Sequence, residues 1–388
     1  KVRATVISIY ASGLYIGSGI GIFIGGLIVD NWNNAYPIIS EAPFGLKGWQ
    51  VAFMAVGIPG MLLALLTWQI KEPPRGLSEG LISSESKNPL KETFKELVGL
   101  TPFGLVGSDN FKKELSINII FTVLIFLASY YLYVLTGDFL QWTAFGIGVY
   151  VICNWIHGLK NRDPVAFLLI FKSKALLLGL LSFPFITFVT YALGAFGPSF
   201  YIRNFSMTAT EVGIIYGLIT VFGSMIGVIC GGILGDKLRE TYVNGKLYLI
   251  MASAVLTGVT AIGFIHSENL VASFTWKFVY HIASTAWLGC AASTVTELVL
   301  PRLRAVASAF FILMLSMIGL ALGPYLTGMV SDIYINSGLL PGPALKNAMT
   351  LTLVVLVLPF GLLAVACKYL KNDEAEIYEK ARSLGEEI

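Results

Sequence analysis

Long apolar runs, separated by short polar segments, follow one another along almost the whole chain. A helix needs about 20 apolar residues to cross the hydrocarbon core of a bilayer. The runs predict about ten membrane-spanning helices, at 5–29, 50–70, 115–135, 139–157, 175–196, 212–235, 247–265, 277–299, 305–330 and 348–370. A membrane β-barrel would need strict alternation of apolar and polar residues, so these continuous runs predict an all-α, polytopic transmembrane helical bundle.

Two of these runs carry the same glycine pattern followed by a carboxylate. The matching sets, at identical spacings, are Gly17, Gly21, Gly26 and Asp30, and Gly319, Gly323, Gly328 and Asp332. Small residues let neighbouring backbones approach closely in a membrane. We therefore expect these glycines to pack helices, and the repeat indicates one structural unit used twice.

Composition and charge agree with a membrane protein. Hydrophobic residues make up 56% of the chain, charged residues 13%, and the mean hydropathy is +0.76. If the first residue lies inside the cell, the basic residues at or near the outer face are only Lys47, Arg203, Lys277 and Lys346. This bias predicts a multi-pass protein of the cell (inner or plasma) membrane with a cytoplasmic C-terminus. The net charge of +3 is spread over loops, so we expect no nucleic-acid partner.

Residues that could carry catalysis are sparse. The cysteines and histidines stand singly, at Cys153, Cys230, Cys290, Cys367, His157, His266 and His281. Their spacing predicts no metal site, no cofactor and no catalytic constellation. A membrane-embedded enzyme would have His157 followed by Asp163 as its one weak candidate pair.

A polar stretch at 71–114, with Pro73-Pro74 and mixed charge, separates two apolar blocks. It predicts a cytoplasmic linker. Within it, apolar residues at helical spacing face away from charged ones and are typical of a helix lying on the membrane surface: Leu90, Phe94, Leu97 and Val98 against Lys91, Lys95 and Glu96. The chain opens with Lys1 and enters an apolar run at once, which is typical of the middle of a protein.

Several motifs carry a family resemblance. In Gly232 to Arg239, a glycine stands four residues before Asp236, and Lys237 and Arg239 follow. This stretch resembles the loop motif that joins the second and third helices of each half in the major facilitator superfamily. Three further segments resemble its glycine-rich fifth helix, the entry to its sixth helix and its spinster-type branch, in that order: Gly17-x-x-x-Gly21 with Gly25-Gly26, Gly48-Trp49-Gln50-Val51-Ala52-Phe53, and Lys71-Glu72-Pro73-Pro74-Arg75-Gly76.

The resemblance covers most of the chain and implies a register. The first two runs then correspond to the fifth and sixth helices, the last six to the seventh to twelfth, and the first four helices are lacking. The implied organisation is two last helices of the N-terminal half at 1–71, the linker at 72–114, two extra helices at 115–160, a six-helix C-terminal half at 173–371 and a cytoplasmic tail at 372–388. Because the two halves of such transporters are parallel repeats, the fifth helix should match the eleventh, as the glycine pattern does.

The sequence departs from the family pattern at two further points. Ile22 stands where the antiport-associated fifth-helix motif carries proline. The second departure is the pair of extra helices between the two halves. Peptide transporters of the superfamily also have two extra helices at that place, which keeps peptides open as a substrate class.

A cytoplasmic gate is implied around Asp236. A carboxylate at a helix end can accept hydrogen bonds from the N-terminus of another helix. The resemblance implies that this partner is the start of the fifth helix, where Arg3 also offers a charge, and that Lys237 and Arg239 meet acidic groups or lipid phosphates. Glu297, just before Arg302 and Arg304, predicts an ion pair at the same gate. The alternative is a solvated, positively charged loop.

Polar and aromatic residues inside spans are candidates for a substrate path, because such groups tend to face a cavity or a partner. The candidates are Tyr10, Tyr15, Tyr191, Tyr216, His281, Ser284 and Thr285. His281 has an ordinary pKa of about 6.5 and could respond to a proton gradient, or it could be a packed, hydrogen-bonded residue. Lys277 is expected to extend to the outer membrane surface.

The predicted function is secondary active transport of a small amphipathic organic solute, lysolipid-like or an organic anion, by alternating access. The expected partners are this solute and membrane lipids, with the complete protein acting as a monomer. Proton coupling stays open. The resemblance places the coupling residues on the first and fourth helices, which are among the four helices that this sequence is expected to lack. The alternatives are a peptide or drug transporter of the same superfamily, a channel or scaffold, and a membrane-embedded enzyme.

Overall fold

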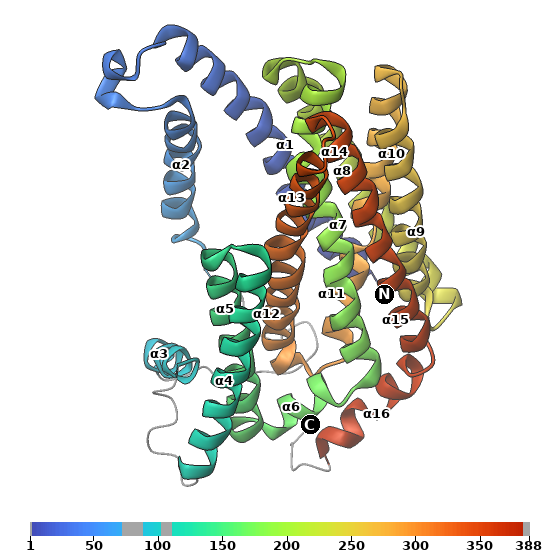
Figure 1. Ribbon diagram of the computed structural model, residues 1–388. Helices are drawn as coiled ribbons and strands as arrows, with labels where there is room; N and C mark the ends of the chain where they lie inside the picture. Colours follow the sequence, from blue (N-terminus) through green and yellow to red (C-terminus); the bar gives the residue numbers. More distant parts are fainter. Residues whose placement is uncertain (1, 72–87, 102–110, 383–388) are drawn as a thin grey trace. The chain divides into compact units, whose positions relative to one another are not determined.

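The computed structural model describes residues 2–71, 88–101 and 111–382, and these ranges contain helices and no strand (Figure 1). The helices, in chain order, are α1 Arg3–Ala35, α2 Gly48–Thr67, α3 Pro89–Gly99, α4 Phe111–Thr136, α5 Phe139–Arg162, α6 Pro164–Phe171, α7 Lys174–Phe205, α8 Ala209–Thr241, α9 Gly245–His266, α10 Leu270–Thr285, α11 Leu288–Glu297, α12 Arg304–Met314, α13 Ala321–Asn336, α14 Pro341–Thr352, α15 Val357–Ala366 and α16 Leu370–Arg382. A π-helical segment, Leu315–Leu320, joins α12 to α13, and a 3-10 segment, Leu353–Leu356, joins α14 to α15.

Nine helical segments within the described ranges are long and apolar enough to cross a membrane, so the all-α membrane fold is confirmed. The predicted run at 277–299 is not one of the nine, because a turn at Ala286 and Trp287 separates α10 from α11. The indole N–H of Trp287 donates to the backbone carbonyl of Ser284 at 3.0 Å, and the ring stacks on Phe183. A buried aromatic contact therefore accompanies the break.

The chain forms two compact units. One is drawn from residues 1–73, 178–297 and 308–371, and the other from 74–177, 298–307 and 372–388. The first unit contains α1, α2 and most of α7 to α15, and the second contains α3 to α6.

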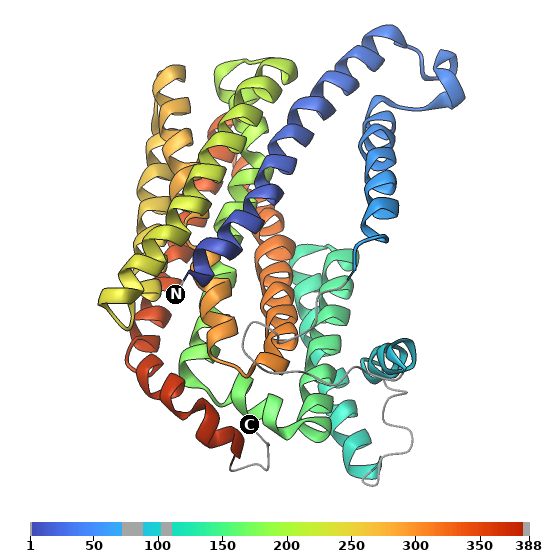
Figure 2. The ribbon, with the colours of Figure 1, turned by 180° about the vertical axis from the view of Figure 1, so that it is seen from behind.

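In the first unit, α1 packs antiparallel along the length of α8 (Figures 1 and 2). Near one end, Ser8 of α1 lies against Gly232 of α8. At the middle, Gly19 lies so close to α8 that a Cβ atom there would stand 2.7 Å from the backbone oxygen of Gly217. The two glycines therefore allow the backbones to meet at the crossing point.

Further glycines of α8 bring it close to α10 and to the turn that follows. A Cβ on Gly223 would lie 3.1 Å from the backbone oxygen of Phe278. Cβ atoms on Gly227 and Gly231 would collide with the backbone of Ile282 and of Ala286. This spacing of four residues places one glycine on the same helix face at each turn, which is a common means of tight packing in membranes.

The repeated glycine pattern occupies two different environments. Gly319 and Gly323 lie directly against α7, at Thr187 and Phe188. The corresponding glycines of α1 are Gly17, Gly21 and Gly26. A Cβ on any of these three would meet no described atom within 4 Å. Gly19 is about 200° around the helix from Gly17, so the α1 face that contacts α8 is a different one. A packing role for the first set stays a prediction.

In the second unit, polar side chains join α3, α4 and α5. The Asn118 amide donates to Asn154 at 2.9 Å, and the Asn154 amide donates to the backbone oxygens of Gly99 and Thr101 at 3.1 and 3.2 Å. The helix expected on the membrane surface is present as α3, and its location in a membrane stays a prediction. The rest of the predicted linker, 72–87 and 102–110, lies outside the described residues, as does 383–388 of the predicted tail.

An ion pair in the second unit fixes the start of α6. Asp163 is the N-cap of α6, where it accepts a hydrogen bond from the Ala166 N–H at 2.9 Å, and it pairs with Arg302 at 2.7 Å. Partial burial alone would raise the pKa of the Asp163 carboxyl, but the hydrogen bonds from Arg302 and the backbone, together with the Arg302 charge, lower it overall. His157 contacts Glu114, so the weak enzyme pair of His157 and Asp163 is not formed.

Candidate functional site

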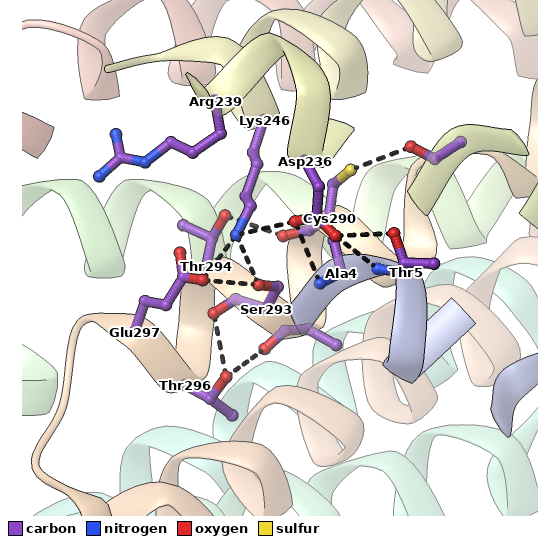
Figure 3. Close-up of polar contacts among 12 residues, drawn as sticks. Ala4, Thr5, Asp236, Arg239, Lys246, Cys290, Ser293, Thr294, Thr296 and Glu297 are labelled. Atoms are coloured by element: carbon purple, nitrogen blue, oxygen red, sulfur yellow. Dashed lines mark hydrogen bonds and ion pairs between the residues drawn. The ribbon is translucent and has the colours of Figure 1, made fainter. Parts of the chain in front are cut away.

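Asp236, near the C-terminal end of α8, binds the N-terminal turn of α1 (Figure 3). Its carboxylate accepts hydrogen bonds from the Ala4 N–H at 3.3 Å, and from the N–H and the hydroxyl of Thr5 at 2.8 Å each. Val2, the N-cap residue of α1, makes no side-chain capping bond. A residue of another helix therefore satisfies the first turn of α1, where free N–H groups and the helix dipole favour an anion.

A buried lysine neutralises this carboxylate. Lys246, at the start of α9, is 4% exposed, and its Nζ lies 3.6 Å from Asp236 and 2.6 Å from Glu297 at the end of α11. The same Nζ donates to the Ser293 hydroxyl at 2.8 Å, and that hydroxyl donates to Glu297 at 2.9 Å. We call Ala4, Thr5, Asp236, Lys246, Ser293 and Glu297 the Asp236 cluster (Figure 3).

Glycines account for the close approach of the helices that carry this cluster. A Cβ on Gly232 of α8 would lie 2.8 Å from the Ala4 backbone oxygen, and one on Gly289 of α11 would lie 2.9 Å from the same oxygen. The start of α1 therefore lies between α8 and α11. Larger residues would push α1 away and break the hydrogen bonds to Asp236.

The other predicted gate residues lie at several places around the Asp236 cluster and in the second unit. Glu297 does form an ion pair, and its partner is Lys246, whereas Arg302 pairs with Asp163 in the other unit. Lys237 is exposed, Arg239 donates to the backbone oxygen of Val243, and Arg3 and Arg304 open α1 and α12.

Sequence reasoning missed Thr5, Lys246 and Ser293. The first two had a weak signal, because each lies in the first turn of the helix that approaches Asp236. Ser293 stands four residues before Glu297 and thus on the same helix face.

Four of the predicted path residues gather where α8 meets α10, and all are at least 90% buried: Tyr216, His281, Ser284 and Thr285. The His281 ring nitrogens lie 3.2 Å from the Ser224 hydroxyl and 3.4 Å from the Thr220 hydroxyl. Thr285 donates to the backbone oxygens of His281 and Ser224. In this conformation, therefore, His281 is a packed, hydrogen-bonded residue.

The remaining path candidates are tyrosines on α1 and α7. Tyr15 is half-buried and lies within electrostatic range of Tyr191 and Tyr280, whereas Tyr191 is 40% exposed. Tyr10 is 88% exposed and lies on the outer side of α1 in this unit. Tyr15 and Tyr191 therefore lie in the same region of the first unit, and Tyr10 is the most exposed of the three.

Lys277 corrects an expectation. It was expected to extend to the membrane surface, but its side chain is fully buried, at 0% exposure. Its Nζ lies over three aromatic rings, at 5.0 Å from the centroid of Tyr216, 4.2 Å from Phe264 and 4.5 Å from Tyr280. We call this arrangement the Lys277 cage. The rings come from α8, α9 and α10, so only the tertiary structure reveals it.

The described part of the chain contains no group of three or more His, Cys, Asp or Glu side chains able to hold a metal ion. The Asp236 cluster can hold helix ends together through buried charges, and the Lys277 cage keeps a buried cation among aromatic rings.

Comparison with known proteins places these features in a family context. A family model described as Major Facilitator Superfamily matches residues 1–324. An "MFS-type efflux pump" of Mycolicibacterium smegmatis is 30% identical over 201 residues, which are 51% of this chain and 45% of that protein. "Protein spinster" of Drosophila melanogaster is 26% identical over 173 residues, 42% of this chain and 28% of that protein. The chain thus spans less than half of the length of either relative.

Solved structures add a likeness of fold. The crystal structure of a bacterial homolog to the human lysosomal transporter Spinster, in an inward-facing and occupied conformation, matches with a TM-score of 0.50. It is 20% identical to this chain, and the match covers 98% of this chain and 71% of the other.

Proposed function

Because the chain belongs to the Major Facilitator Superfamily, we propose that it works as a spinster-type secondary transporter that moves a small amphipathic organic solute, lysolipid-like or an organic anion, by alternating access. The observation that carries this proposal is the Asp236 cluster. It joins α1 to α8, α9 and α11 through hydrogen bonds and ion pairs that hold helix ends together without covalent linkage.

The Asp236 cluster has the properties of a latch. Alternating access requires contacts that hold one side of the transporter closed in one state and release it in the other. Hydrogen bonds from a helix N-terminus to a carboxylate break when the helix moves by a few ångströms, because their geometry is strict. The buried ion pairs make the closed arrangement specific, since separating Lys246 from its carboxylates leaves buried charges unpaired.

The register of helices is part of the proposal. We assign α1 and α2 to the fifth and sixth helices of a major facilitator and the region 173–371 to its C-terminal half. The contact between α1 and α8 is then a contact between the two halves. The charge distribution supports a cytoplasmic location for the Asp236 cluster and for the C-terminus, with the protein in the cell membrane.

The substrate path is proposed to run along Tyr15, Tyr191 and Tyr216, with His281, Ser284 and Thr285 beside them. Tyrosines offer large apolar faces together with hydroxyl groups, which suits a solute with both an apolar and a polar part. Tyr191 provides the exposed end of this path.

Counterflow in proteoliposomes tests the function. The protein is isolated from its own membranes, its intact mass is measured, and it is reconstituted into phosphatidylcholine vesicles preloaded with an unlabelled lysophospholipid or fatty acid. A carrier gives saturable uptake of the labelled solute, faster when the same solute is present inside. Linear uptake without this stimulation would indicate a channel, and no uptake of any solute in the panel would contradict the proposal.

The alternative is a drug or peptide transporter of the same superfamily. The similarity to a protein described as an MFS-type efflux pump favours the drug class. Competition separates the candidates: a cationic dye or a dipeptide that inhibits counterflow, when lysophospholipids and fatty acids do not, would favour the alternative. A pH jump across the vesicle membrane during the same assay tests coupling to protons.

A further inference from the structure

Lys277 occupies an unusual position for a cation. It lies on α10, its side chain is fully buried, and its Nζ makes no hydrogen bond within the described part of the chain. A buried ammonium group normally has an ionised partner or several acceptors, because an unpaired charge in a medium of low polarity is costly.

The Lys277 cage supplies part of the missing stabilisation. Ring faces attract a cation within about 6 Å of their centroids, and Tyr216, Phe264 and Tyr280 all meet this criterion. The rings leave the three N–H bonds of the ammonium group without an acceptor, however. The Tyr280 hydroxyl also makes no hydrogen bond of normal geometry, although Ser284 lies next to it. The Lys277 ammonium group and the Tyr280 hydroxyl are therefore neighbouring donors, and both lack a hydrogen-bond acceptor.

Nearby polar groups do not fill this role. The ring nitrogens of His281 face Ser224 and Thr220, and the Thr220 hydroxyl donates to the backbone oxygen of Tyr216. The carboxylate of Asp236 is 20 positions further along α8 than Tyr216, which corresponds to about 30 Å. That carboxylate is also already bound to Lys246.

Two further tyrosines of the first unit lie within electrostatic range of one another or of the cage. Tyr280 belongs to the cage, Tyr15 of α1 lies within electrostatic range of it, and Tyr191 of α7 lies within the same range of Tyr15. Exposure rises along this file, from 2% at Tyr280 to 40% at Tyr191.

We propose that Lys277 binds an oxyanion, a carboxylate or a phosphate, carried by the transported solute. The ammonium group and the Tyr280 hydroxyl donate to this oxyanion, and the tyrosine file contacts the apolar part of the molecule. The inference deepens the transport function proposed above and rests on it for the identity of the ligand as a transported solute.

A matched pair of probes tests this assignment. Oleoyl lysophosphatidic acid and monooleoylglycerol have the same acyl chain and differ by the phosphate group. Their binding to the protein in phosphatidylcholine nanodiscs is measured through tryptophan fluorescence, and oleate is the carboxylate probe. We expect wild type to bind both oxyanions at least tenfold more tightly than monooleoylglycerol.

The variants decide whether Lys277 is responsible. Lys277→Met should remove the tenfold preference and leave binding of monooleoylglycerol unchanged, whereas Lys277→Arg should retain most of it. Lys277→Gln replaces the methionine variant if the latter does not fold. Lys346→Met, in the middle of α14, is the control and should behave as wild type. An absent preference in wild type, or the same preference in Lys277→Met, would overturn the inference.

Counterflow measured on the same preparations separates this inference from the transport function. Transport without any preference for oxyanions would refute the role of Lys277 and leave the transporter proposal standing. Binding of oxyanions that depends on Lys277, without counterflow of either probe, would refute transport of this class of solute and support the binding site.

Discussion

The carboxylate of Asp236 accepts two hydrogen bonds from Thr5, a residue 231 positions earlier in the chain. One comes from the backbone N–H and the other from the hydroxyl, each at 2.8 Å, and both end on the same carboxylate oxygen. A single residue of α8 thus caps α1 from outside, in place of the local cap that Val2 does not provide. The connection is directional and depends on the position of both helices.

Removing Lys246 should destabilise the protein strongly. Lys246→Met leaves the carboxylates of Asp236 and Glu297 without their cation, and breaking a buried pair in this way costs about 3 kcal/mol. We expect a clear fall in the melting temperature in detergent, and a shift of the transporter towards the state in which α1 is released from α8. Thermal unfolding measures the first effect, and cysteine labelling at position 8, with Ser8→Cys as the reporter, measures the second.

A second substitution checks the cause. Adding Asp236→Asn to Lys246→Met removes one of the unpaired charges, so the double variant should lose less stability than the sum of the single variants. Lys237→Met, next to Asp236 but exposed, is the matched control and should change the melting temperature little. Strict additivity of the two buried substitutions would mean that Lys246 and Asp236 do not interact.

The glycine face of α8 should not tolerate side chains. In Gly231→Ala, the added methyl group would collide with the Ala286 backbone, and overpacking of this kind costs about 1–3 kcal/mol. The expected result is a lower melting temperature and weaker counterflow. Gly361→Ala on α15, where a Cβ meets no described atom within 4 Å, should be neutral or slightly stabilising. Equal effects at the two positions would argue against close packing of α8 on the turn that follows α10.

The pair of Asp163 and Arg302 predicts a small dependence of stability on pH. Because the pKa of Asp163 is lowered in the folded state, the pair contributes its full stability above the ordinary value of about 4. That contribution is lost as the pH falls through the lowered value. Both side chains are partly exposed, so we expect less than about 1 kcal/mol.

Comparison of wild type with Asp163→Asn isolates this term, because asparagine keeps the N-cap of α6 but not the charge. The difference between their melting temperatures should be constant above pH 5 and shrink below pH 4. Arg302→Met should reduce this difference but not abolish it, because the backbone hydrogen bonds to Asp163 remain. A difference that grows on acidification would contradict the direction of the pKa shift.

Asn154 should hold α3 to the hairpin of α4 and α5. Asn154→Ala removes three hydrogen bonds and leaves the buried Asn118 amide without one acceptor, at a cost of about 1–3 kcal/mol. We expect faster hydrogen exchange at Pro89–Gly99 while α8 and α10 keep their protection. Thr101→Ala changes a side chain at the same place but leaves the backbone oxygen, so exchange there should stay close to wild type.

Much of the fold follows from the sequence because its signals are local. Apolar runs of sufficient length give the membrane helices directly, and the glycine and aspartate of the α8 loop motif indicated that Asp236 would meet the start of α1. That contact is present in the structure. The rule that a carboxylate suits a helix N-terminus is local, but the family resemblance was what implied that this N-terminus is the start of α1.

The remaining features depend on several helices at once. Lys277 looked like a residue that reaches the membrane surface, since its position in the run fits that role, and only the rings of Tyr216 and Phe264 from other helices reveal its burial. Lys246 was missed as the partner of Glu297 because it comes from another helix, α9. In the sequence, Arg302 is the nearer basic residue. The break before Trp287 has no glycine or proline to announce it.

The antiparallel crossing of α1 and α8 has a mechanical consequence. Besides the bonds at Asp236, the Thr210 hydroxyl donates to Asp30 at the opposite end of the pair, and the glycine contact at Gly19 lies between these two ends. At about 1.5 Å per residue, the arms on either side of Gly19 are about 22 and 16 Å long, so a tilt of about 10° would part the longer one by about 4 Å. The two helices can therefore pivot about the glycine contact at Gly19. Separation of the helices at Asp236 then brings them closer together at Asp30.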